Sequence, residues 1–112
     1  MNLCQLVVYI PETHTDLVKD ALFAAGAGEY DGYDSCAWQV SGTGQFRPCD
    51  GATPFLGRVG EVEQVTEDRV EMLCRTEKLG AIIRALRDAH PYDVPAYHVL
   101  PLLNPDDFSA GR

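Results

Sequence analysis

The residues with the greatest capacity for chemistry gather in one short stretch, His90 to His98, which reads HPYDVPAYH. Imidazole and carboxylate groups are common ligands of divalent metals, and imidazole also carries protons near neutral pH. His90, Asp93 and His98 therefore form a candidate metal site, with His90 alone as a candidate proton carrier. The alternative is structural, because a histidine at a helix end gains from the helix dipole and Pro91 stops the helix.

A second cluster, GTGQFRP, runs from residue 42 to residue 48. Gly42 and Gly44 permit tight turning, and the planar guanidinium of Arg47 suits a carboxylate or a phosphate. A ligand site here would combine Gly42, Gly44 and Arg47 with His90 and Tyr92 at the helix end. The alternative is a hairpin turn in which Arg47 pairs with a local acid, because no phosphate-binding loop of known spacing is present.

Other polar residues do not assemble into a catalytic group. In the run Asp34 to Cys36, strand neighbours point to opposite faces, and Cys36 is predicted to lie in the core. Four charged residues at alternate positions of two strand candidates predict a solvent-exposed face with cross-strand pairs: Glu61, Glu63, Arg69 and Glu71. The sequence therefore predicts a protein that is not an enzyme.

Length and charge exclude several classes of protein. The chain has 112 residues, 46% of them hydrophobic, and a net charge of −8, which fits one acidic globular domain. The acidic balance disfavours nucleic acid and membrane surfaces as partners. Neither a signal peptide nor a membrane span is expected. The four cysteines, at positions 4, 36, 49 and 74, lack metal or disulfide spacing, which predicts free thiols in the cytoplasm.

Apolar patterns predict the elements. Strands are expected at 3–10, 34–41, 61–65, 69–74 and 96–103, with a turn at 66–68. Helices are expected from about residue 12 or 13 to residue 25, where Gly26 follows, and between an N-cap at Thr76 and Pro91. The Gly- and Pro-rich segment 42–60 carries Phe46, Phe55 and Leu56, which indicates an ordered excursion. The domain is expected at 1–103, with a flexible tail at 104–112.

This order of elements predicts the α+β, ferredoxin-like βαββαβ fold, with both helices on one face of an antiparallel sheet and a loop excursion between its halves. The other face of the sheet is then open, and association with another chain would cover it. Trp38 is a candidate for such an interface, and a place in the core is the alternative.

Several motifs together resemble the YqfO domain of the NGG1-interacting-factor-three family. They are the Ala-Gly-Ala-Gly run that begins at Ala25, the run from Tyr33 to Cys36, the segment 42–48 and the stretch from His90 to Tyr97. The resemblance spans Leu6 to about Leu103. In larger members this domain is an insert between two lobes that hold a di-metal site, sometimes labelled a cyclohydrolase homologue. Only the insert matches, so that site is not carried over.

The insert also resembles PII and CutA proteins, which are trimeric ferredoxin-like domains. The resemblance implies a non-enzymatic binding or regulatory domain that forms a homo-oligomer, a dimer or a trimer, and that binds a protein or small-molecule ligand without needing a cofactor. A CutA-like protein that binds a divalent metal is the alternative, and a nucleotide hydrolase homologue is a more remote one.

Overall fold

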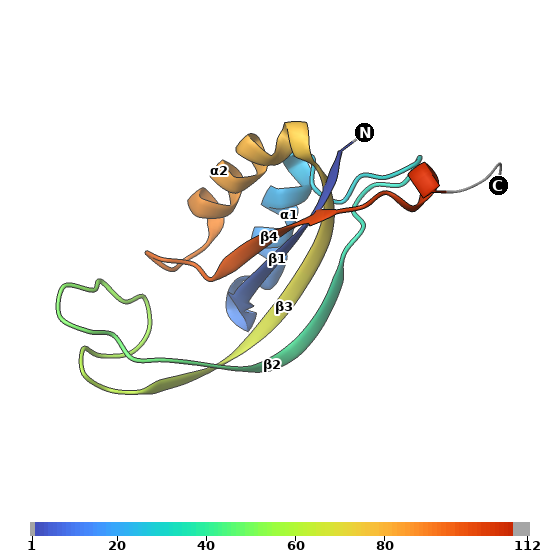
Figure 1. Ribbon diagram of the computed structural model, residues 1–112. Coiled ribbons are helices and arrows are strands. Elements are labelled where there is room, and N and C mark those ends of the chain that lie inside the picture. The colour runs from blue at the N-terminus through green and yellow to red at the C-terminus, as the bar shows by residue number, and fades with distance from the viewer. Residues whose placement is uncertain (1, 109–112) are drawn as a thin grey trace.

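Four strands and two helices follow one another in the order βαββαβ within residues 2–108, the part of the chain that the computed structural model describes (Figure 1). Short 3₁₀ helices precede both α-helices, at Glu12–His14 and Thr76–Lys78, and a third lies at Pro105–Phe108. The main elements are β1 (Leu3–Pro11), α1 (Thr15–Ala24), β2 (Trp38–Phe46), β3 (Glu63–Arg75), α2 (Leu79–Ala89) and β4 (Tyr97–Leu102).

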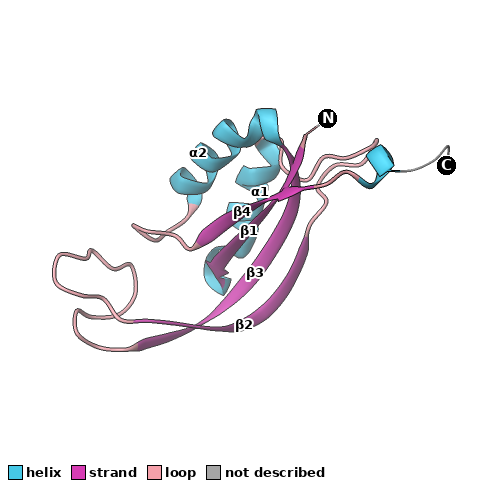
Figure 2. Cartoon of the chain, in the orientation of Figure 1, coloured by secondary structure: helices cyan, strands magenta, loops and turns pink. Residues whose placement is uncertain are grey.

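The strands form one antiparallel sheet in the order β2-β3-β1-β4. Both α-helices cover the same face of this sheet, and within residues 2–108 no α-helix covers the other face (Figure 2). The predicted ferredoxin-like fold is therefore confirmed. Each helix belongs to a crossover connection. β1 leads through α1 to β2, which lies beyond β3, and β3 leads through α2 to β4, which lies beyond β1.

The core lies between the sheet and the helices. Alternate residues of β1 point toward the helices, so Leu6 and Ile10 are fully buried there. Val18 and Leu22 are four residues apart on α1 and pack into the same cluster. Ile82 and Leu86 give α2 its matching apolar stripe. This spacing of apolar residues is the reason that these segments fold as helices on one layer.

The paired strands β2 and β3 differ from the prediction. β2 begins at Trp38 rather than at residue 34 and runs through both glycines to Phe46, so the segment 42–46 is strand and not loop. The predicted strands 61–65 and 69–74 are one strand, because β2 supplies residues 41–43 as partners for 66–68, where a turn was expected. The loop excursion consequently spans 47–62.

The structure also differs from the prediction before α2 and in the C-terminal segment. Thr76 is not a side-chain cap of α2; its backbone N–H instead donates to the carbonyl of Asn2 at 3.0 Å. Gly26 does follow α1 in the left-handed region, with a φ of +107°. In the segment predicted as a flexible tail, Pro105–Phe108 forms a 3₁₀ helix, and 109–112 lie outside the described residues.

The open face of the sheet carries large apolar side chains. Trp38 is 59% exposed on β2, so it does not belong to the core. The other exposed apolar residues of this face are Val40 on β2 and Leu100 and Leu102 on β4, at 46%, 45% and 37%. We call these four residues the open-face patch. No helix within residues 2–108 has the length and apolar character to cross a membrane.

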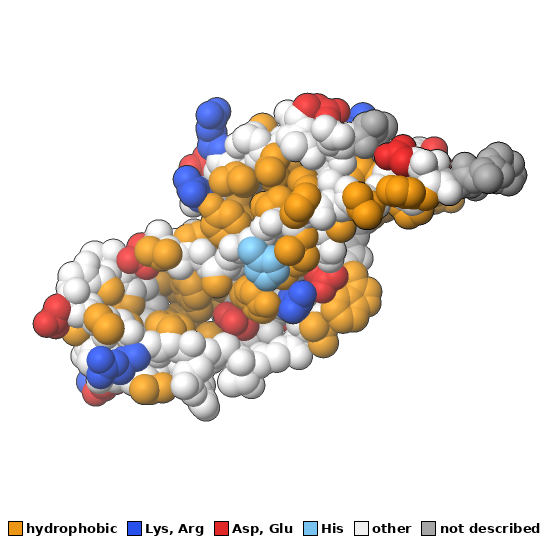
Figure 3. Space-filling model, in the orientation of Figure 1, with side chains coloured by type: hydrophobic (Ala, Val, Ile, Leu, Met, Phe, Trp, Pro, Cys, Tyr) orange, Lys and Arg blue, Asp and Glu red, His pale blue; other side chains and the backbone are white. Residues whose placement is uncertain are grey.

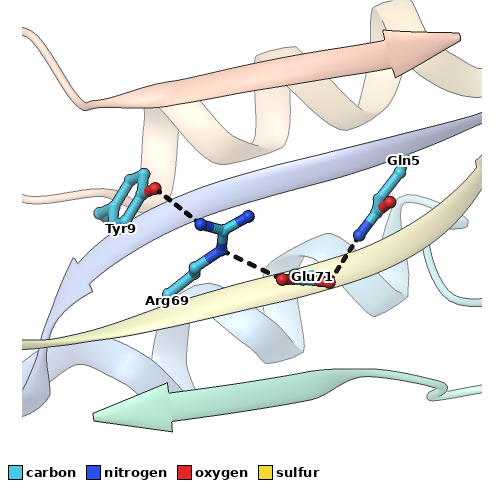
Figure 4. Close-up of polar contacts among 4 residues, drawn as sticks. All are labelled: Gln5, Tyr9, Arg69 and Glu71. Atoms are coloured by element: carbon cyan, nitrogen blue, oxygen red, sulfur yellow. Dashed lines mark hydrogen bonds and ion pairs between the residues drawn. The ribbon is translucent and has the colours of Figure 1, made fainter. Parts of the chain in front are cut away.

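A polar network crosses the centre of this face (Figure 4). Gln5 Nε2 donates to Glu71 Oε1 at 2.6 Å, and Arg69 Nε donates to Glu71 Oε2 at 3.0 Å. Arg69 Nη1 also donates to the Tyr9 hydroxyl at 3.3 Å. The predicted pairing between two strands is wrong, because Glu63, Arg69 and Glu71 lie on the single strand β3 and Arg69 pairs with Glu71 along it. Glu61 lies in the 47–62 loop and not on a strand.

Candidate functional site

A pocket of about 420 Å³ opens where the 47–62 loop meets the ends of β2 and β3. The segment 92–96, which connects α2 to β4, forms its opposite wall. In Figure 3 a hollow floored by hydrophobic side chains separates the loop from the rest of the molecule. Its apolar lining includes Phe46, Pro48, Phe55, Leu56, Tyr92 and Val94.

Aromatic rings form one side of the pocket. The Tyr92 ring centroid lies 5.8 Å from that of Phe46 and 6.2 Å from that of Phe55. His14, from the turn before α1, packs edge-on against Phe55 at 5.4 Å. Tilted and edge-on pairs at these separations add to the stabilisation from burial. The cluster therefore holds the loop against the body of the domain.

Two ionisable groups lie close together in this pocket. The Tyr92 hydroxyl is buried and has no hydrogen-bond partner among the residues that the structure describes. Burial raises the pKa of Tyr92, and the negative charges of Glu67 and Glu63 raise it further. Burial also raises the pKa of Glu67. Gly44 makes room for Glu67, because a Cβ at Gly44 would overlap the carboxylate.

His90 is a buried structural histidine. Its Nε2 lies 2.7 Å from the carbonyl oxygen of Tyr9, and its Nδ1 accepts the backbone N–H of Tyr92 at 3.1 Å. The neutral ring with its proton on Nε2 satisfies both bonds. Both ring nitrogens are therefore engaged within the fold, and the bond from Nδ1 positions the backbone of Tyr92.

The stability of the domain is expected to decrease as the pH falls below 6.5. Burial lowers the pKa of His90 from its ordinary value of 6.5, and the charge of His14 lowers it further. The unfolded chain therefore takes up a proton at a higher pH than the folded chain, and protonation favours unfolding. Urea unfolding of the wild type and of His90→Gln at pH 7.5 and pH 5 checks this. Equal losses of stability in both proteins would contradict it.

Asp93 anchors the loop to the segment that follows α2. The backbone N–H and the hydroxyl of Thr53 donate to Asp93 Oδ2 at 3.3 Å and 3.1 Å. These bonds lower the pKa of Asp93, so the carboxylate stays charged near neutral pH. The contact joins residue 53 of the loop to the segment that follows α2.

Replacing Asp93 with alanine is expected to loosen the loop without unfolding the domain. The variant loses both bonds to Thr53, while the core between sheet and helices is untouched. Limited trypsin digestion should then cut more rapidly after Arg58, which lies in the loop. Asp88→Ala, on the exposed side of α2, is the control and should digest like the wild type.

The structure brings some predicted site residues together and separates others. Arg47 and Tyr92 line the pocket, whereas Gly42 lies outside it on β2. His98 lies on β4 near Tyr9, with ring centroids 6.4 Å apart. The predicted metal set is therefore not assembled. No group of three His, Cys, Asp or Glu residues within 2–108 is arranged to hold a metal ion.

The sequence predicted the state of the cysteines, but it did not predict two residues near the pocket. All four cysteines are free thiols, as predicted, but Cys36 is only partly buried and lies before β2, not in the core. Sequence reasoning missed Glu67, which it placed in a turn, and Thr53. Phe46 and Phe55 gave a usable signal, because apolar rings in a Gly-rich segment indicate a packed loop.

The fold defines the class of domain. CutA from Archaeoglobus fulgidus, a periplasmic divalent cation tolerance protein, superposes with a TM-score of 0.65 at 15% identity, over 91% of this chain and 85% of that one. CutA from Synechococcus elongatus gives a TM-score of 0.64 at 20% identity, over 91% and 78%. The chain thus has a CutA-like ferredoxin fold; at these identities the likeness concerns the fold alone.

Sequence similarity identifies the family. A Bacillus cereus protein related to NIF3 superposes with a TM-score of 0.80 at 37% identity, over 92% of this chain and 26% of that one. A GTP cyclohydrolase 1 type 2 homolog of Mycobacterium leprae is 43% identical over 112 residues, which are 99% of this chain and 29% of that protein. No family model matches the chain. The chain matches the YqfO-like domain of the NGG1-interacting-factor-three family in sequence and fold, and it spans less than a third of the length of these relatives.

Proposed function

We propose that the chain is a non-enzymatic binding or regulatory domain that associates with copies of itself through the open face of its sheet. The observation that carries this is the open-face patch, in which Trp38, Val40, Leu100 and Leu102 expose apolar surface on one side. Burying such side chains against another surface removes apolar area from water, which favours association.

The charges of this face support a second copy as the occupant. Two chains that each carry −8 repel one another, so they associate best where local charge is balanced. Arg69 is paired with Glu71 at 3.0 Å in the centre of the open face. The pair adds no net charge at the centre of the face, and the apolar residues of the open-face patch lie on the strands at either edge, β2 and β4.

Sedimentation velocity of the wild-type protein at micromolar concentration tests the proposal. We expect a dimer or a trimer of the 12.3 kDa chain. A single monomeric species across that range of concentration would contradict it. The mass also distinguishes a dimer from a trimer.

The binding role belongs to the pocket between the 47–62 loop and the segment 92–96. Support comes from its lining, because mostly apolar walls with a few convergent polar groups are typical of small-molecule sites. Arg47, Glu67 and Tyr92 are these polar groups. The loop that closes the pocket is fixed to the domain by Thr53 and Asp93.

GTP is expected to stay intact when it is incubated with the protein, with and without divalent metal. His90 has both ring nitrogens engaged, and Asp93 is bonded to Thr53. Neither group is free to act as a general base. Chromatography of the nucleotide after prolonged incubation checks this; metal-dependent loss of GTP above that of a protein-free control would contradict the non-enzymatic assignment.

A further inference from the structure

We propose that the pocket binds an organic amine, with its ammonium group between the Glu67 carboxylate and the Tyr92 hydroxyl and its flat apolar body against Phe46 and Phe55. The inference rests on the proposed use of this pocket as a ligand site. It adds the charge and the shape of the ligand.

The charge of the ligand follows from Glu67. Arg69, the neighbouring cation on the same face of β3, forms an ion pair with Glu71 and a hydrogen bond with Tyr9. Within the described part of the chain, Glu67 therefore has neither an ion-pair partner nor a hydrogen bond. A partly buried carboxylate of this kind is stabilised by a cation that donates N–H bonds. Glu63, four residues away on the same face, strengthens the preference for positive charge.

The Tyr92 hydroxyl supplies the second polar contact. It is buried without a partner, and an unsatisfied buried polar group costs free energy that a ligand can recover. An ammonium group can donate to the hydroxyl oxygen and to Glu67 at the same time. The rings of Phe46 and Phe55, whose centroids lie 5.8 Å and 6.2 Å from that of Tyr92, present apolar surface to the flat body of the ligand.

Gly44 keeps the carboxylate in position. Its φ lies outside the left-handed region, so alanine fits the backbone, but the added Cβ would overlap the Glu67 carboxylate and displace it. Gly42 lies on the same strand and the same face, and a Cβ there meets nothing within 4 Å. Gly44→Ala therefore displaces the Glu67 carboxylate, whereas the matched control Gly42→Ala leaves it in place. Neither substitution changes the charge of the site.

Calorimetric titration with three indole compounds tests the inference. Tryptamine carries the ammonium group, indole is neutral, and indole-3-acetate is an anion of similar shape. We expect tryptamine to bind at least tenfold more tightly than the other two. We expect Glu67→Gln and Gly44→Ala each to weaken tryptamine about tenfold or more, as loss of a charge-assisted hydrogen bond does. Tyr92→Phe should weaken it several-fold, and Gly42→Ala should bind like the wild type.

The outcomes separate this inference from the proposed function. Equal affinity for the three compounds, or unchanged tryptamine binding by both Glu67→Gln and Gly44→Ala, would overturn the amine inference and leave a ligand pocket. Absence of binding by all three would overturn the inference and remove the support for the pocket's binding role. Sedimentation of the same samples reports self-association independently, and circular dichroism verifies that each variant is folded.

Discussion

Truncating Trp38 to alanine is expected to weaken self-association about 30-fold or more. Aromatic residues at the centre of an interface commonly contribute 2 kcal/mol or more when removed, which corresponds to that factor. Trp38 is the largest side chain of the open-face patch and is 59% exposed within a single chain. Since it contributes little to the core, its removal should change assembly far more than folding. Sedimentation equilibrium of the variant and the wild type measures the difference.

Leu17→Ala is the control for this experiment. Leu17 is a similarly exposed apolar residue, at 57%, but it lies on α1 and therefore away from the open face. We expect its association constant to match that of the wild type. If Trp38→Ala and Leu17→Ala behaved alike, the open face would not be the interface.

Gly28→Ala is expected to destabilise the domain by about 3 kcal/mol. Gly28 has a φ of +75°, a conformation that costs other residues about 1–2 kcal/mol. An added Cβ would also lie 2.6 Å from the backbone oxygen of Cys36, which cannot move as a flexible side chain can. The N–H of Gly28 donates to Leu73 at 2.8 Å and its carbonyl accepts from Cys36 at 2.9 Å. A shift that relieves the clash would weaken these bonds, each with a net contribution of about 1 kcal/mol.

Gly32→Ala separates the conformational cost of a positive φ from the cost of the steric clash. Gly32 also has a positive φ, of +88°, but a Cβ there meets nothing within 4 Å. We therefore expect a loss of only about 1–2 kcal/mol, the conformational cost alone. Urea unfolding at neutral pH measures both variants. Equal losses of stability in the two variants would show that the clash with Cys36 does not contribute to the effect of Gly28→Ala.

The sequence predicts the layers of this fold better than the lengths of its strands. Apolar residues at helical or strand spacing identify β1, both helices and β4, because each of these elements packs against one core. The paired ends of β2 and β3 lack this signal. Gly42, Gly44 and the run 66–68 are typical of turns, yet they pair across the strands as Gly42 with Glu67 and Thr43 with Thr66.

The site was less predictable for a related reason. Arg47 and Tyr92 stand out because their residue types suggest binding, and both line the pocket. Glu67 does not stand out among 17 acidic residues. Its environment depends on the register that places it beside Gly44, together with the position of Tyr92 far along the chain. His90 shows the opposite case, since its residue type suggests chemistry while both of its ring nitrogens are engaged in hydrogen bonds within the fold.

The ends of β2 and β3 extend past the rest of the sheet (Figure 1), and this has a mechanical consequence. β1 pairs with β3 only as far as Glu67, so residues 63–66 are held by β2 alone. A ribbon of two strands bends more easily than a sheet of four. The ribbon carries Phe46, whereas Tyr92 belongs to the rigid end of the domain, so bending changes the width of the pocket. A ligand that bridges the two sides would therefore stiffen the ribbon, and its binding would reduce the movement of the loop tip.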